Sequence, residues 1–293
     1  MNKTKLFFLI LLISIFYILI NKDYRKVHPY INQTTKTLNI AHRGGLGLSP
    51  ENTIFSFNKA VASGADILEM DIHSTSDSIL VLLHDNKLNR TTNGKGYVWD
   101  FTIESIKELN AGFYWTKDDS ITFPFRESGI EIPTLEEVFI NFNDYKLNIE
   151  IKHHEAHVAK NLCHLIQKYD MQSNVLVGSF NDKILLEFRK DCPTVATSSA
   201  RDETKLFYGL NYLYLDYFYS PNLDIFQLPE YFRDTYVLSE NFIKSSQNKN
   251  IPIFVWTVND SNEMKRFIDL GINGIITDYP DRLSEVLKTY NSN

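Results

Sequence analysis

Short apolar runs with strand character alternate with helix-like segments along most of this chain, and this alternation constrains the fold more than any other feature. Parallel strands need long crossover connections, usually helices, so the alternation predicts a parallel sheet with helical crossovers. The sixth run lies in an aromatic-rich region, residues 207–236, that shows no clean period. The runs are Leu38–Ala41, Ile67–Ile72, Leu147–Ile151, Asn174–Ser179, Thr194–Thr197, Tyr212–Leu215, Ile251–Val258 and Gly274–Thr277.

Residues 37–293 have the length of a single TIM (β/α)8 barrel, for which about 250 residues are typical. We therefore predict an α/β fold of this kind. One further run, Ile79–Leu83, follows the second strand too closely for a parallel crossover, which needs about a dozen residues. It predicts a hairpin on the second strand, in a register that brings His84 opposite Glu69 to within about one residue.

An uninterrupted apolar stretch, Leu6–Ile20, lies between basic residues near the start of the chain. A helix over it would span about 23 Å, and flanking lysines would make up the difference from a bilayer core of about 30 Å. No small-x-small cleavage site follows, so an uncleaved anchor is favoured over a cleaved signal peptide. We expect a basic N-terminus at 1–5, a single transmembrane anchor at 6–21, a tether at 22–36 and the folded domain at 37–293. Basic residues on both sides leave the orientation open, and we favour an extracytoplasmic domain.

Composition narrows the class of protein. Hydrophobic residues make up 43% of the chain and charged residues 23%, which is ordinary for a folded domain. A formal net charge of -6 gives no reason to expect a nucleic-acid partner. The two cysteines, Cys163 and Cys192, have no metal-site spacing and cannot build a disulfide framework, so we expect them to be small buried hydrophobes.

Two pairs of charged residues alternate with apolar residues on predicted strands. Glu69 and Asp71 are two apart, so both carboxylates point to one face, and a hard divalent cation would relieve their repulsion. Glu150 and Lys152 repeat this geometry, and they would offer a further ligand and a positive charge for a phosphate. The alternatives are a solvent-facing acidic pair and a solvated edge strand.

Two histidines lie beside short predicted strands, His42 after the first and His84 after the hairpin run. Imidazole titrates near neutrality, so the pair is suited to exchange protons with a nucleophile and a leaving group, although a single histidine is more often structural. Arg43 would bind a phosphate through its forked guanidinium, and Gly44–Gly45 would let the backbone approach a ligand. Together these residues suit metal-assisted phosphodiester hydrolysis.

The order and spacing of several motifs resemble those of the glycerophosphodiester phosphodiesterases. The resemblance covers nearly the whole chain after the predicted anchor. A small departure lies in the hairpin turn Thr75–Ser78, which lacks the lysine and glycine usual in the family. The matching segments are Ala41–Gly44, Pro50–Thr53, Gly64–Asp66, Glu69–Asp71, His84–Asp85, Arg90–Gly94, Ile132–Glu137, Asn148–Lys152, Trp256–Asn259 and Gly274–Asp278.

The resemblance implies a TIM barrel of the phosphodiesterase type that releases sn-glycerol 3-phosphate and an alcohol. It implies that His42 and His84 act as acid and base. One divalent cation, Mg²⁺ or Ca²⁺, would bind Glu69, Asp71 and Glu150, with His84 as a possible further ligand. Arg43 and Lys152 would contact phosphate, and Trp256 would pack on the glycerol end of the substrate.

Two other functions stay open. The first is a lysophospholipase D acting at a membrane, motivated by the predicted anchor and by the aromatic residues between Phe207 and Tyr219, which could form an apolar lip or an interfacial belt, although such residues are more often core. The second is a catalytically inactive, membrane-tethered binding module. The complete set of histidines and carboxylates argues against it.

Overall fold

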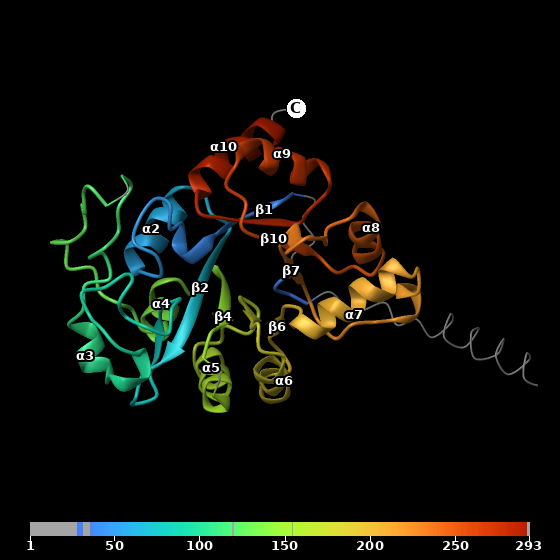
Figure 1. Ribbon diagram of the computed structural model, residues 1–293. Helices are drawn as coiled ribbons and strands as arrows, with labels where there is room; N and C mark the ends of the chain where they lie inside the picture. Colours follow the sequence, from blue (N-terminus) through green and yellow to red (C-terminus); the bar gives the residue numbers. More distant parts are fainter. Residues whose placement is uncertain (1–27, 32–35, 119, 154, 292–293) are drawn as a thin grey trace, which may run out of the picture.

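Parallel strands occupy the centre of the molecule and helices lie around them (Figure 1). The computed structural model describes residues 28–31, 36–118, 120–153 and 155–291. A parallel bridge between Ser198 and Ile225 joins the two end strands, so the sheet curls into a TIM-like barrel. In sheet order the strands are β6 (Ala196–Thr197), β5 (Val175–Gly178), β4 (Lys146–Ile151), β2 (Ile67–Ser74), β1 (Leu38–Ala41), β11 (Gly274–Thr277), β10 (Ile253–Val255) and β7 (Phe226–Leu228).

Helices connect the strands and begin at well-formed caps. Thr53, Thr134, Ser239 and Asp260 each accept a hydrogen bond from a backbone N–H of the first helical turn, which satisfies a donor that the helix itself leaves unpaired. The helices are α2 (Ile54–Ala62), α3 (Ile103–Lys107), α4 (Leu135–Asn141), α5 (Ala156–Lys168), α6 (Asp182–Asp191), α7 (Arg201–Tyr212), α8 (Glu240–Asn248), α9 (Ser261–Asp269) and α10 (Pro280–Asn291), with short 3-10 turns η1 (His42–Gly44), η2 (Val98–Asp100) and η3 (Asp216–Phe218).

The predicted strands are confirmed at every position except the sixth. The prediction of a strand at Tyr212–Leu215 is wrong, because Tyr212 ends α7 and the chain turns there. The sixth parallel strand in chain order is instead β7, which lies further along the chain and is three residues long. Side chains in the predicted run are exposed, Tyr212 to 74%, so its apolar character does not reflect burial in a sheet.

The predicted hairpin is also confirmed. The strand β3 (Leu80–Leu82) pairs antiparallel with β2 and sets Ile72 opposite Leu82. Continued by two residues, this register brings His84 opposite Met70, one position from the predicted Glu69. A second, two-stranded hairpin consists of β8 (Tyr231–Phe232) and β9 (Thr235–Tyr236).

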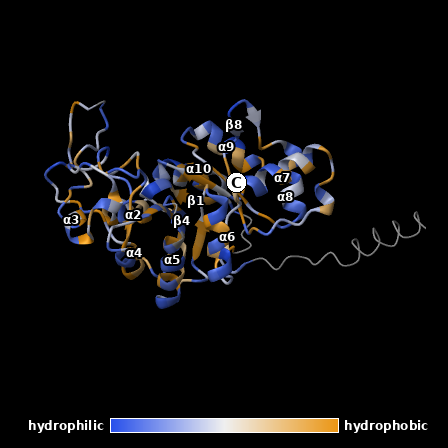
Figure 2. Cartoon of the chain, turned by 60° about the horizontal axis from the view of Figure 1, so that its bottom comes forward, coloured by the Kyte–Doolittle hydropathy of each residue, from blue (hydrophilic) through white to orange (hydrophobic). Residues whose placement is uncertain are grey.

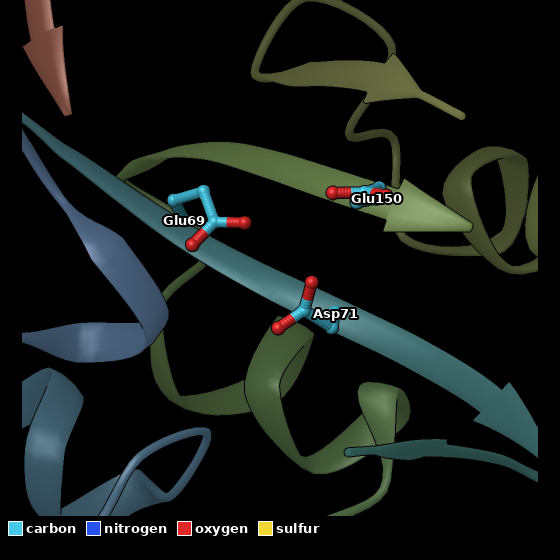
Figure 3. A group of neighbouring side chains, drawn as sticks. All are labelled: Glu69, Asp71 and Glu150. Carbon is cyan, nitrogen blue, oxygen red and sulfur yellow. The ribbon is translucent and has the colours of Figure 1, made fainter. Parts of the chain in front are cut away.

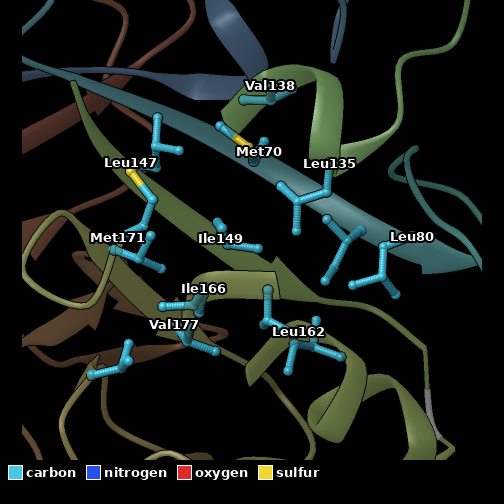
Figure 4. Close-up of a cluster of buried hydrophobic side chains, with 14 of the residues drawn as sticks. Met70, Leu80, Leu135, Val138, Leu147, Ile149, Leu162, Ile166, Met171 and Val177 are labelled. Carbon is cyan, nitrogen blue, oxygen red and sulfur yellow. The ribbon is translucent and has the colours of Figure 1, made fainter. Parts of the chain in front are cut away.

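The outer face of the sheet packs against the helices. The central strands are mostly apolar, whereas the helices around them carry both polar and apolar residues (Figure 2). Met70 of β2 and Ile149 of β4 face the helices in one buried cluster with Leu135 of α4 and Leu162 of α5 (Figure 4). Each such side chain contributes about 1.5–3 kcal/mol on burial.

The inner face of the strands is apolar at its amino end. The N-terminal segment closes this end: Tyr30 is 1% exposed, and His28 Nε2 lies 3.0 Å from the Thr194 carbonyl oxygen. Because strand residues alternate between faces, the residue two positions after each of these interior residues also points inward, nearer the carboxyl end. The buried interior cluster comprises Tyr30, Ile40, Ile67, Leu176, Ala196, Ile225, Phe254 and Ile276.

Cys163 and Cys192 are buried as expected, but they are not two separate hydrophobes. They form a disulfide, with Cα atoms 5.6 Å apart. The bond forms because α5 and α6 pack side by side, and Cys192 directly follows α6. A separation of 29 residues gave no sign of this contact.

The predicted anchor at residues 6–21 and most of the predicted tether lie outside the described residues. Among the helices that the structure describes, none combines the length and the apolar character needed to cross a membrane. The anchor therefore stays a prediction from the sequence.

Candidate active site

A cavity of about 470 Å³ opens at the carboxyl ends of the strands. Several of its lining residues follow an apolar interior residue by two positions, as Glu69 follows Ile67 and His42 follows Ile40. Because side chains two residues apart on a strand point to the same face, the mostly polar lining of the cavity lies directly above the apolar interior layer. The lining residues from the strand ends are His42, Glu69, Glu150, Gly178, Ser198, Gln227 and Trp256.

Three carboxylates meet at this end of the barrel. Glu69 and Asp71 project from β2, and Glu150 projects from the neighbouring β4 (Figure 3). Asp71 and Glu150 occupy paired positions of the two strands, so the register brings them together. One ligand oxygen from each of the three lies within 4.8 Å of the other two. His84 lines the same cavity but does not belong to this close group, and its role as a ligand stays a prediction.

Two cations partly compensate the carboxylates. Lys152 Nζ lies 3.2 Å from Asp71 Oδ1 and 2.9 Å from Glu150 Oε1. Arg43 Nε lies 3.4 Å from Asp71 Oδ2. Although burial alone would raise the pKa of Asp71, Lys152 and Arg43 hold it below the usual value. Burial raises the pKa of Glu150, which Lys152 only partly offsets.

Glu69 is the least compensated member of the group. Burial and the neighbouring Asp71 raise its pKa to about 7, while the Arg43 backbone N–H donates a hydrogen bond of 2.7 Å to Glu69 Oε2. The group is therefore short of positive charge. A divalent cation would supply it, and an all-oxygen donor set suits Mg²⁺ or Ca²⁺. The residues present fit such an ion.

His42 is held by Asp278, the residue that directly follows the last strand, β11. Its Nδ1 lies 2.6 Å from Asp278 Oδ1, and Asn259 Nδ2 donates to Asp278 Oδ2 at 2.6 Å. Burial would lower the pKa of His42, but the hydrogen bond to Asp278 and the charge of Glu69 raise it above the usual value. The bond at Nδ1 leaves Nε2 for the cavity.

His84 has a similar partner with a different supporting residue. Its Nδ1 lies 2.7 Å from Asp85 Oδ1, and Arg90 Nε donates to Asp85 Oδ2 at 2.7 Å. Burial lowers the pKa of His84, and the charges of Lys152 and Arg43 add to this effect against the opposing Asp71 and Asp85. His42 is thus biased toward its protonated form and His84 toward its neutral form.

The turn after β1 sets the position of Arg43. Arg43 has φ 51° and Gly44 has φ 78°, both in the left-handed region. A Cβ on Gly44 would lie 2.3 Å from Ser56 Oγ, so glycine is needed for the turn to pack on α2. The structure therefore gives Gly44 a packing role, and its predicted role in admitting a ligand stays a prediction. Arg43 Nη1 donates to Glu51 at 3.0 Å, which fixes the guanidinium beside the cavity.

The sequence matches the model of the glycerophosphoryl diester phosphodiesterase family over residues 42–282. The chain belongs to this family. The predicted resemblance is thereby confirmed, and the matched region runs from His42 of the first strand end to the start of the last helix.

Relatives of the family share most of the chain. This chain is 36% identical over 262 residues to a glycerophosphodiester phosphodiesterase of Caldanaerobacter subterraneus subsp. tengcongensis. The match covers 86% of this chain and 98% of the relative. The chain is 27% identical to the mouse lysophospholipase D GDPD1, covering 91% of each. Among solved structures, a putative glycerophosphoryl diester phosphodiesterase from Silicibacter pomeroyi superposes with a TM-score of 0.73 at 22% identity, covering 90% of this chain and 97% of that one. An Oleispira antarctica phosphodiesterase in complex with the product sn-glycerol-3-phosphate superposes with a TM-score of 0.66 at 22% identity, over 85% and 96%.

The structure brings every predicted site residue to this cavity, although their roles remain predictions. Trp256 lines it opposite Phe180, with ring centroids 5.8 Å apart. Asp71 lies beneath the lining and is 1% exposed. The sequence reasoning assigned no role to several supporting residues. They are Glu51, Asn52, Asp85, Arg90, Asn259 and Asp278.

Proposed function

We propose that this protein hydrolyses glycerophosphodiesters to sn-glycerol 3-phosphate and an alcohol. The observation that carries the proposal is the meeting of three carboxylates and two aspartate-bound histidines around one cavity. Membership of the family and the 36% identical relative support the same reaction. The alternative of an inactive binding module explains none of these arrangements.

The two histidines would divide the proton transfers. His84, with its lowered pKa, would accept the proton of the attacking hydroxyl, and His42, with its raised pKa, would donate a proton to the leaving alcohol. Asp278 and Asp85 would hold the two rings in the tautomers that these steps need. The two assignments follow from the surroundings of each ring: Asp278 and Glu69 raise the pKa of His42 against burial, whereas burial, Lys152 and Arg43 lower the pKa of His84.

The charged residues would bind and orient the phosphate. Glu69, Asp71 and Glu150 would hold a Mg²⁺ or Ca²⁺ ion, which when bound polarises phosphoryl oxygens. Lys152 and Arg43 line the cavity beside these carboxylates and would oppose the negative charge of the phosphate. Trp256 would pack on the apolar face of the glycerol.

A lysophospholipase D reaction is the second candidate, because one wall of the cavity is apolar. Leu228, Pro229, Phe232 and Val237 line the wall on the side of the β8–β9 hairpin. An acyl chain would bury apolar surface there at about 25 cal/mol per Å². The mouse relative bears the name of this activity. Of the aromatic segment in the sequence, Tyr208 lines the cavity, whereas Phe207 is core and Tyr212 is exposed at the end of α7.

The decisive test is product release by the full-length protein from glycerophosphocholine and from lysophosphatidylcholine, with EDTA and with added Mg²⁺ or Ca²⁺. We expect activity on glycerophosphocholine that EDTA abolishes and a metal restores. A Glu69→Ala, Asp71→Ala double variant is the matched control. Turnover of lysophosphatidylcholine alone would favour the second candidate. A folded wild type no faster than the double variant on both substrates would favour the binding module.

A further inference from the structure

Exposed aromatic and leucine side chains gather where α7 ends and the chain turns toward β7. Tyr212 and Tyr214 are 74% and 79% exposed, and Leu213, Leu215 and Phe218 are between 45% and 61% exposed. We call these five residues the aromatic patch. We propose that this patch lies against a lipid bilayer, so that the amino end of the barrel faces the membrane and the cavity faces away from it.

The patch lies at the end of a helix that lines the cavity. Four residues of α7 line the cavity, and they reach from the start of the helix to one turn before its end: Arg201, Thr204, Lys205 and Tyr208. Tyr212 ends the same helix, about 16 Å beyond Arg201 and about 6 Å beyond Tyr208 at 1.5 Å per residue. Because barrel helices run antiparallel to the strands, this end of α7 lies at the amino ends of the strands. A membrane touching the patch would therefore leave the cavity open to water.

One exposed residue of the patch, Tyr214, has a left-handed backbone conformation, which is costly for a residue other than glycine. Tyr214 has φ 58°, at the position after the helix where glycine is favoured, and Leu215 N donates to the Leu210 carbonyl oxygen at 2.8 Å. Burial of the Tyr214 side chain within the fold does not offset the strain, since the side chain is exposed. The turn therefore places the Tyr214 side chain in solvent directly after the end of α7.

The chain outside the described residues joins the barrel at this same end. His28 bonds to Thr194 just before β6, and Tyr30 fills the amino end of the interior. The preceding 27 residues include the apolar stretch Leu6–Ile20. If that stretch enters a bilayer, as the sequence predicts, the amino end is the part of the barrel held closest to it.

The chemistry of the patch suits a membrane interface. Tyrosine places an apolar ring in the headgroup region and keeps its hydroxyl in water, and leucine and phenylalanine bury more deeply. The disulfide between Cys163 and Cys192 favours a barrel outside the cytoplasm, because such bonds persist in oxidising compartments. The bilayer face would then be the extracytoplasmic one.

The β8–β9 hairpin offers a matched comparison at the other end of the barrel. Tyr231 is 56% exposed there, beside Phe232 of the cavity wall, but does not itself line the cavity. If the mouth faced the membrane, Tyr231 would approach the lipid and Tyr212 would not. The two tyrosines therefore report opposite orientations.

The test places a tryptophan at each position in the full-length protein, reconstituted into phosphatidylcholine vesicles with or without brominated acyl chains. Wild-type emission is subtracted as background. We expect the added emission of Tyr212→Trp to be quenched by brominated lipid and that of Tyr231→Trp to be unaffected. Thermal midpoints equal to that of the wild type confirm that both variants fold.

Quenching at Tyr231→Trp without quenching at Tyr212→Trp would overturn the proposal and would place the cavity at the bilayer. Absence of quenching at both positions would also overturn it and would leave the patch to a protein partner. The readout does not depend on turnover, so these outcomes are separate from the fate of the proposed reaction.

Discussion

The two ends of the barrel interior differ although the same strands build both. At the amino end the inward side chains are apolar and Tyr30 fills the centre. Two residues further along, the inward side chains include Glu69 and His42, which line the cavity. Stability and chemistry are therefore assigned to successive layers of one structure. Substitutions in one layer should leave the other largely unaffected, and the following predictions test that separation from the largest expected effect to the smallest.

Removing either histidine should abolish most activity without unfolding the protein. We expect His42→Ala and His84→Ala each to lower kcat at least about 100-fold, because one acid or base group contributes about 10²–10⁴-fold. The measurement is steady-state turnover together with the thermal midpoint. His164→Ala, on the exposed face of α5, is the control and should retain full activity. A loss below about tenfold at either position would contradict its role.

Removing the Tyr30 ring should lower the stability of the protein without lowering its activity. We expect Tyr30→Ala to lower the free energy of unfolding by about 3 kcal/mol, because it leaves a cavity at the amino end. The kcat of the folded fraction should stay at the wild-type value. The buried Tyr30 hydroxyl has no hydrogen-bond partner among the described residues, so Tyr30→Phe should keep or raise stability by up to about 1 kcal/mol. Urea denaturation measures both, and a fall in kcat of the folded Tyr30→Ala protein would break the separation.

The two aspartates beside the histidines should not be equivalent. Asp278 raises the pKa of His42, so Asp278→Asn should lower the protonated fraction of His42 at neutral pH. We expect a loss of about 10- to 100-fold in kcat and an alkaline limb of the pH profile that moves to lower pH. Asp85→Asn would lower the pKa of His84 further, but His84 is already biased toward its neutral form. Its effect should be smaller, and equal losses would contradict the assignment of acid and base.

Without a divalent cation the stability should depend on pH through Glu69. The pKa of Glu69 is raised by burial and Asp71 to about 7, above its ordinary value of 4.5. Between those values the unfolded chain has released the proton that the folded protein keeps, so stability falls as pH rises from about 5 to about 7. We expect a loss of about 2 kcal/mol between pH 5 and pH 7 in EDTA. In thermal melts, Glu69→Gln should reduce the dependence of stability on pH. A wild-type stability that instead increases between pH 5 and pH 7 would contradict the raised pKa of Glu69.

Much of the fold could be predicted because strand period and helix alternation are local signals. The sixth strand could not be predicted, because β7 has only three residues and gives a weak signal. The apolar run before it, Tyr212–Leu215, looks like a strand in the sequence, but its side chains are exposed. The disulfide between Cys163 and Cys192 depends on helix packing, which the spacing of two cysteines does not encode.

The candidate site was predictable where it lies on the strands. Asp278 follows the interior Ile276 by two positions, and the same rule that pairs Glu69 with Ile67 could have located it. Arg90 and Glu51 could not be found this way. They meet across two loops, where Arg90 donates to Glu51 at 2.7 and 2.8 Å, and no periodicity relates loop residues.

The closure of the ring of strands also has a consequence for motion. β2 and β4 pair continuously from Ile67 to Ile72. The strands β6 and β7 instead meet at an isolated bridge, where Ser199 N donates to the Ile225 carbonyl oxygen and Asp224 N donates to the Thr197 carbonyl oxygen. Amide hydrogens at this junction should exchange with solvent earlier than those of β4, because fewer neighbouring bonds must break together. Ser198 and Ser199 also line the cavity. Local opening of this junction would therefore act on the cavity wall beside α7, while the paired strands β2 and β4 would keep the carboxylates in place.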